Sequence, residues 1–229
     1  DIAIVRRYLT LRDVGSYYLS LQMMGLLQQP AIMLNIVIGP VLVTYLSEGS
    51  PGAINRYVES VIPKLIFLWS LATAVLILLA EPLIPFMFGS SFKESLASFR
   101  ILGVGMASMG LFFTCVPVLV TYERVKPIMI AQVLMGLVMA GGCLFAVPSW
   151  GVVGAASVKT AALVFSSLLL LWEVRRTTGK GDLRIVGFLS LPLLAVVSQK
   201  WGFSSPYLLA GAILVFLLII FFAVQYRLV

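Results

Sequence analysis

One lysine in an apolar run is the residue best suited to hold an anion. Lys159 lies in the stretch GVVGAASVKTAALVFSSLLLLW, residues 151–172, where every other residue suits the interior of a bilayer. A charged side chain at mid-bilayer costs about 3 kcal/mol on insertion scales, so such residues usually face a bundle interior or a water-filled path. Its helical neighbours Ala155, Ala156 and Ala162 are small and let a helix or a ligand approach closely. This pattern favours a cationic site in a cavity.

Snorkelling is the alternative interpretation of Lys159. The helix that carries it is expected to begin at Val152, about 10 Å away along the axis. Helical side chains lean toward the N-terminus, so the ammonium group could reach the outer interface without any binding role. Both interpretations stay open on the sequence.

A second candidate group consists of amide side chains. Gln22 and Gln29 share one helical face at a spacing of seven residues, as do Gln28 and Asn35. Amides in hydrocarbon require hydrogen-bond partners. They form either the wall of a wet cavity, where they would bind substrate, or hydrogen bonds that hold helices together.

Other polar residues carry weaker signals. Arg6 and Arg7 follow the first apolar segment and are either flanking charges or further substrate contacts, and Glu81 is expected to be solvated near the outer boundary. Cys115 and Cys143 lie in apolar runs and are predicted to be buried thiols. The chain has no His, no phosphate-cradling Gly-rich loop and no carboxylate cluster, so the sequence predicts no catalytic residue, no metal site and no cofactor.

Composition determines which elements must position these side chains. Of the 229 residues, 61% are hydrophobic and only 11% are charged, whereas a soluble domain keeps about a quarter of its residues charged. The chain is therefore predicted to be a multi-pass membrane protein. The net charge of +7 fits basic loops on the inner side of a membrane better than nucleic-acid binding, because the basic residues are scattered between apolar segments.

Because backbone groups in lipid must be satisfied within a segment, the apolar segments predict an all-α helical bundle. The segment 14–47 is longer than a bilayer requires and is expected to tilt, to kink at Pro30 and Pro40, or to project. The predicted segments are a partial one at 1–10 and full ones at 14–47, 61–88, 96–122, 127–147, 152–172, 185–200 and 206–226.

The basic residues divide between the two predicted sides. The richer side is assigned to the cytoplasm. It holds Arg56, Lys64, Arg124, Lys126, Arg175, Arg176, Lys180, Arg184 and Arg227. The poorer side holds Arg6, Arg7, Arg12, Lys93, Arg100 and Lys200.

Several stretches together resemble the polysaccharide flippase branch of the multidrug/oligosaccharidyl-lipid/polysaccharide exporter superfamily. Each stretch is degenerate alone, and their order and spacing over residues 1–175 make the resemblance fairly specific. They are DIAIVRRYLTLRDVGSYYLSLQM, IGPVLVTYLSEG, AEPLIPFMFGSSFKESLASFRILGVG and AVPSWGVVGAASVKTAALV. Lys159 falls where many relatives have a small or hydroxyl residue, so its role is not inherited from the resemblance.

The resemblance implies the second transmembrane lobe of a two-lobe flippase at 1–176, with its first helix truncated, and two additional C-terminal helices at 177–229. It implies a missing N-terminal lobe of the same protein. The implied activity is flipping of a lipid-linked oligosaccharide, on an undecaprenyl diphosphate carrier, across the cytoplasmic (inner) membrane. Its partners would be that substrate and membrane lipids, and no covalent chemistry would be needed.

Three alternatives remain on the sequence. A cation-coupled drug exporter of the same superfamily would favour a carboxylate deep within a span. A membrane-embedded glycosyltransferase or polymerase would need catalytic groups gathered at one face, and a passive scaffold would keep no cavity. The longest predicted loops offer Glu48, Glu59, Glu173 and Asp182.

Overall fold

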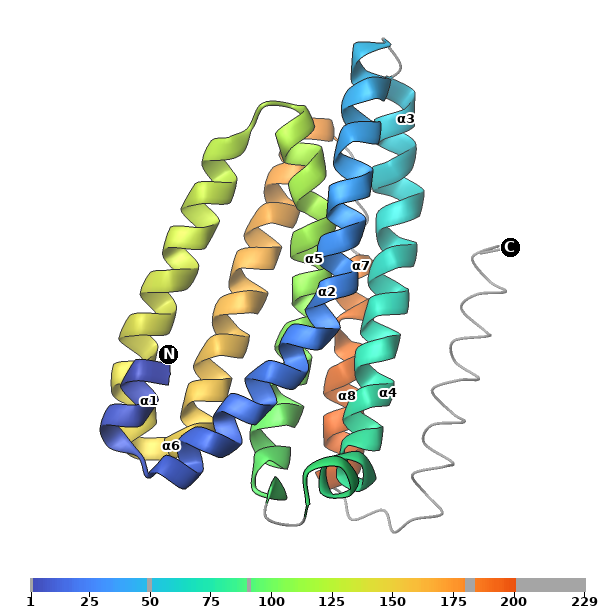
Figure 1. The fold of residues 1–229 in the computed structure, drawn as a ribbon. Coiled ribbons are helices and arrows are strands. Elements are labelled where there is room, and N and C mark those ends of the chain that lie inside the picture. The colour runs from blue at the N-terminus through green and yellow to red at the C-terminus, as the bar shows by residue number, and fades with distance from the viewer. Residues whose placement is uncertain (1, 49–50, 90–91, 180–183, 201–229) are drawn as a thin grey trace.

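The computed structural model describes residues 2–48, 51–89, 92–179 and 184–200. Every regular element in these ranges is helical (Figure 1). The elements are α1 (Ile2–Tyr8), α2 (Leu11–Ser47), α3 (Pro51–Arg56), the π-helix η1 (Tyr57–Val61), α4 (Ile62–Phe88), α5 (Ser95–Thr121), α6 (Val125–Thr178), α7 (Arg184–Phe188) and α8 (Ser190–Lys200). The prediction of an all-α bundle is confirmed for the described part of the chain.

Four of these helical stretches are long and apolar enough to cross a membrane. They are Leu11–Ser47, Gly52–Phe88, Ser95–Thr121 and Val125–Thr178. α2 runs diagonally across the bundle in Figure 1, and its 37 residues measure about 55 Å along the axis. Its length agrees with the expectation that this segment tilts or projects.

The stretch α6 consists of two arms that run in opposite directions (Figure 1). The backbone reverses at Gly151, whose φ of 58° and ψ of −137° are open to glycine and unfavourable for other residues. The arms cover 125–150 and 152–178, in place of the predicted segments 127–147 and 152–172. Residues 148–150, predicted as a polar break, continue the first arm.

The predicted loop at 48–60 is also mostly helical. α3 and η1 run directly into α4, because Ile54, Tyr57 and Val58 recur at helical spacing and are buried. In a regular α-helix the ring of Pro63 would clash with the carbonyl of Glu59, and the wider π turn lets the chain pass.

The predicted helix at 185–200 is interrupted. Leu189 separates α7 from α8, and Pro192 lies in the first turn of α8, where a proline favours a helix start. α8 packs against α4, with Ala195 in contact with the cluster around Ala74 and Ile77. The predicted helix at 206–226 lies outside the described residues.

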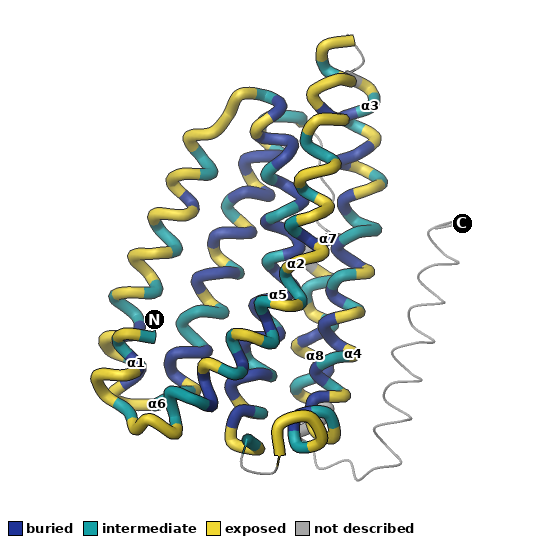
Figure 2. Tube along the Cα trace, in the orientation of Figure 1, coloured by how far each residue is buried: buried dark blue, intermediate teal, exposed yellow. Residues whose placement is uncertain are grey.

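The helix α5 forms the centre of the bundle. It packs against α2, α4 and α6, and Figure 2 shows it buried along most of its length. Small residues allow this: a Cβ atom at Gly103 would lie 2.7 Å from Ile77 Cδ1, and Gly110 is in contact with the Trp69 ring. Cys115 of α5 and Cys143 of α6 are buried thiols, as predicted.

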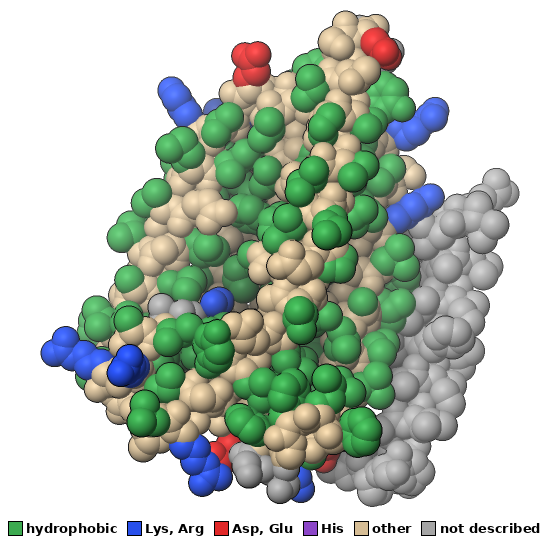
Figure 3. Space-filling model, viewed as in Figure 1, with side chains coloured by type: hydrophobic (Ala, Val, Ile, Leu, Met, Phe, Trp, Pro, Cys, Tyr) green, Lys and Arg blue, Asp and Glu red, His purple; other side chains and the backbone are tan. Residues whose placement is uncertain are grey.

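On the face shown in Figure 3, most charged side chains lie toward the two ends of the bundle, and hydrophobic side chains predominate between them. Among the described residues, three ion pairs link neighbouring elements: Arg12 with Glu94 at 2.9 Å, Arg100 with Glu81 at 3.2 Å, and Arg124 with the buried Glu173 at 3.0 Å. Glu81 is therefore paired as well as exposed. Glu173, predicted in a loop, lies in the second arm of α6.

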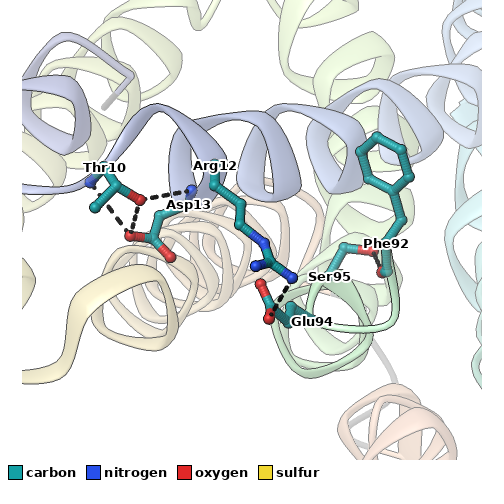
Figure 4. Close-up of polar contacts among 6 residues, drawn as sticks. All are labelled: Thr10, Arg12, Asp13, Phe92, Glu94 and Ser95. Carbon is teal, nitrogen blue, oxygen red and sulfur yellow. Dashed lines mark hydrogen bonds and ion pairs between the residues drawn. The ribbon is translucent and has the colours of Figure 1, made fainter. Parts of the chain in front are cut away.

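The start of α2 is fixed by a reciprocal capping arrangement (Figure 4). Thr10 Oγ1 accepts a hydrogen bond from the Asp13 backbone N–H at 3.3 Å, and Asp13 Oδ2 accepts one from the Thr10 backbone N–H at 3.2 Å. The Arg12–Glu94 ion pair then joins α2 to the residue before α5.

Candidate functional site

A cavity of about 290 Å³ lies between α2, α5 and both arms of α6. Among the described residues, Lys159 and Gln28 supply its polar side chains. The rest of the lining is apolar and rich in methionine: Met24, Met106, Met109, Met135 and Met139. Figure 3 shows a hollowed part of this face in which a basic side chain lies among apolar ones.

Hydrogen bonds to α5 set the rotation of the second α6 arm. Thr160 Oγ1 donates to the Ile101 carbonyl at 2.8 Å, and Ser167 Oγ donates to the Ser108 carbonyl at 2.7 Å. Ala155 and Ala156 are fully buried in the adjoining core. With these side chains against the bundle, Lys159 is half-buried and turned into the cavity.

The cavity can bind an anion that carries an apolar chain. None of the described residues that line it is acidic, and Lys159 is the one charged side chain among them. The Gln28 amide can donate and accept hydrogen bonds. Thioether and leucine side chains offer flexible apolar contacts.

Asn35 lies at a separate, smaller hollow lined also by Trp69 and Gly110. Its Nδ2 donates to the Phe113 carbonyl at 3.2 Å. Pro117, four residues after Phe113, has no N–H to bond that carbonyl within α5. Asn35 therefore supplies the donor that Pro117 removes, which agrees with the helix-joining interpretation, and its substrate role stays a prediction.

The other predicted site residues lie on the surface of the described chain. Gln22 and Gln29 are exposed on α2, and the Gln22 amide donates to the Tyr18 hydroxyl. Arg6 and Arg7 are exposed on α1. None of these four lines the cavity at Lys159.

The structure thus brings Lys159 together with Gln28 and separates Gln28 from Asn35. Sequence reasoning missed the methionine lining. Its signal was the spacing: Met106 and Met109 are three residues apart and Met135 and Met139 four, so each pair shares a helical face.

No profile of a known protein family and no curated protein matches the chain. Among solved structures, the chain is similar to a lipid II flippase, MurJ, in an inward closed conformation, with a TM-score of 0.67 at 18% sequence identity. The match covers 94% of this chain and 47% of that one, so the chain spans about half the length of the flippase. At this identity the likeness establishes the fold: this chain has about half of the helical architecture of MurJ.

Proposed function

We propose that the chain is one lobe of a transporter that flips a lipid-linked oligosaccharide, carried on undecaprenyl diphosphate, across the cytoplasmic membrane during cell-surface polysaccharide biosynthesis. Residues 1–176 form the second lobe of this polysaccharide flippase, and 177–229 form additional helices. An N-terminal lobe of the same protein closes the opposite side of the cavity. The two lobes rock in alternating access about the substrate.

The observation that carries this proposal is Lys159, half-buried in a cavity between α2, α5 and α6. A flippase must offset the charge of a diphosphate while it moves through a low-dielectric region, and a cation in the cavity does so by direct attraction. Gln28 hydrogen-bonds sugar or phosphate oxygens. The methionines contact the first apolar units of the carrier.

The likeness to a flippase fold supports the same function. Asn35, Gln22 and Gln29 are assigned to the path of the sugar on α2, and Arg6 and Arg7 to the entrance at the α1 end. None of these five residues lines the Lys159 cavity.

A cation-coupled drug exporter is less well supported. Such a protein needs a carboxylate in its cavity to bind a proton or a cation, and no described lining residue is acidic. Within the described ranges, Glu81 and Glu173 each pair with an arginine.

The test uses the full-length protein in a host without its own flippase, with delivery of lipid-linked oligosaccharide to the outer leaflet as the readout. At matched expression, Lys159→Ala is expected to lower transport at least about tenfold, which corresponds to about 1.4 kcal/mol of lost interaction. Lys159→Arg is expected to retain most of it.

Lys126→Ala is the control, because Lys126 is an exposed cation at the end of the bundle. Full transport by Lys159→Ala would show that Lys159 snorkels to the interface and has no role in binding. No transport by the parent protein would reject the flippase assignment itself.

A further inference from the structure

A third hollow lies at the end of the bundle where α2 meets α3 and η1. Its volume is about 420 Å³. Valines of α2 form one wall, and residues of α3 and η1 form the other. The side chains that define it are Val37, Val41, Tyr45, Arg56, Tyr57 and Val61. None of its lining residues belongs to the Lys159 cavity.

The groove is built into the fold. The π turn at Tyr57–Val61 widens the helix at this wall, and π turns occur frequently at functional sites. The Tyr57 hydroxyl donates to the Thr114 carbonyl of α5 at 3.3 Å, which holds that ring against the bundle. The opposite wall stays open, since Val37 is 65% exposed and Val41 46% exposed.

The groove combines an apolar floor with one cation. Arg56, at the end of α3, is its only charged lining residue among those described and is exposed. The same end of the bundle carries further basic residues: Lys64, Arg124, Lys126, Arg175 and Arg176. The described acidic residues of this end, Glu48, Glu59, Glu123 and Glu173, do not line the groove.

We propose that this groove binds one anionic phospholipid. An acyl chain lies along Val37 and Val41, and the phosphate pairs with Arg56. One wall of the groove belongs to α2, a helix long and apolar enough to cross a membrane, and in a bilayer an acyl chain is an occupant available to an open apolar surface. A basic end attracts anionic lipid over zwitterionic lipid. The site is separate from the flippase cavity and does not depend on the proposed transport.

The test counts phospholipids retained by the full-length protein in native mass spectrometry, after titration with phosphatidylglycerol or phosphatidylcholine. The parent protein is expected to retain phosphatidylglycerol with several-fold preference over phosphatidylcholine. Val41→Trp fills the groove and is expected to lower the number of retained phosphatidylglycerol molecules by one, with any lipid in the Lys159 cavity unaffected. Val43→Trp is the matched control, because Val43 is 49% exposed on the same helix and does not line the groove.

A second pair of variants tests the head group. Arg56→Ala is expected to remove the preference for phosphatidylglycerol, Arg56→Lys to keep part of it, and Lys126→Ala to leave it unchanged. Equal retention by Val41→Trp and Val43→Trp would overturn the proposal, as would an undiminished preference in Arg56→Ala. Thermal unfolding of each variant, without added lipid, verifies that the compared proteins are folded.

Discussion

The helices α5 and α2 cross the same bundle with opposite environments. In the most apolar stretch of α5, 72% of the residues are buried, against 11% in that of α2. α5 is rich in Gly, Ala and Ser where neighbouring helices approach, while α2 carries four amide side chains and exposed apolar ones. One helix is held by close contact on all sides, and the other by contacts on one side.

The difference in burial indicates that α5 holds the bundle together and that α2 provides the surface for binding. Side chains from α2, α4 and α6 donate hydrogen bonds to carbonyls of α5, among them Trp69 Nε1 to Met106 at 2.9 Å. α2 contributes to the lining of all three described hollows. Substitutions should therefore change stability most on α5 and binding most on α2.

The largest effect on stability is expected at Gly110. A Cβ atom there would overlap the Trp69 ring, which is held by its bond to the Met106 carbonyl. Gly110→Ala should lower the free energy of unfolding by about 1–3 kcal/mol, as overpacking does elsewhere. Denaturant titration of the purified protein in detergent measures it.

Gly136→Ala on α6 is the control, because nothing lies within 4 Å of a Cβ atom there. It should be neutral or slightly stabilising, since alanine favours a helix over glycine by up to about 1 kcal/mol. Equal losses in the two variants would mean that close packing does not set α5 apart.

An intermediate effect is expected where the two helices meet. Asn35→Leu removes the donor to the Phe113 carbonyl and should cost about 1 kcal/mol, the usual scale for such bonds between membrane helices. In a Pro117→Ala background, the alanine at position 117 has a backbone N–H that can donate to the Phe113 carbonyl. There the same substitution should cost almost nothing.

The measurement is a double-mutant cycle in the free energy of unfolding. If Asn35→Leu lowered the free energy of unfolding equally in the Pro117→Ala background and in the parent protein, the Asn35 amide would not replace the donor that Pro117 removes. Only the substrate role would then remain for it.

The smallest effect is expected at the exposed ends of the two helices. Arg12 and Glu94 form a 2.9 Å ion pair, but their side chains are 68% and 55% exposed. Arg12→Ala should change the free energy of unfolding by less than about 1 kcal/mol, and added salt should remove the difference. A larger, salt-resistant loss would show that α2 is anchored at this end by more than its surface charges.

Hydrophobic segments and prolines predicted most of the helices in the described ranges. The predictions were wrong where a polar segment was interpreted as a loop. SEGSPGAINRYVES is polar overall, yet Ile54, Tyr57 and Val58 share a face that only the packed bundle buries. Glu173 was assigned to a loop for the same reason, whereas Arg124 pairs with it inside the fold.

The site was predicted only in part, because periodicity identifies a face and not the neighbour across it. Lys159 was singled out by its charge in an apolar helix, and it does line a cavity. Gln28 and Asn35 share a face of α2, but they line different hollows because α2 crosses α5. Pro117 does leave a carbonyl without its helical donor, although no local pattern names Asn35 as the substitute.

The reversal at Gly151 bears on how the protein is made. Each arm of α6 has about 26 residues, or about 39 Å, which exceeds the hydrocarbon thickness of about 30 Å. Each arm is thus longer than the hydrocarbon layer, and a single residue joins the two. Because a single residue joins the two arms, we expect them to enter the bilayer together as a helical hairpin during synthesis.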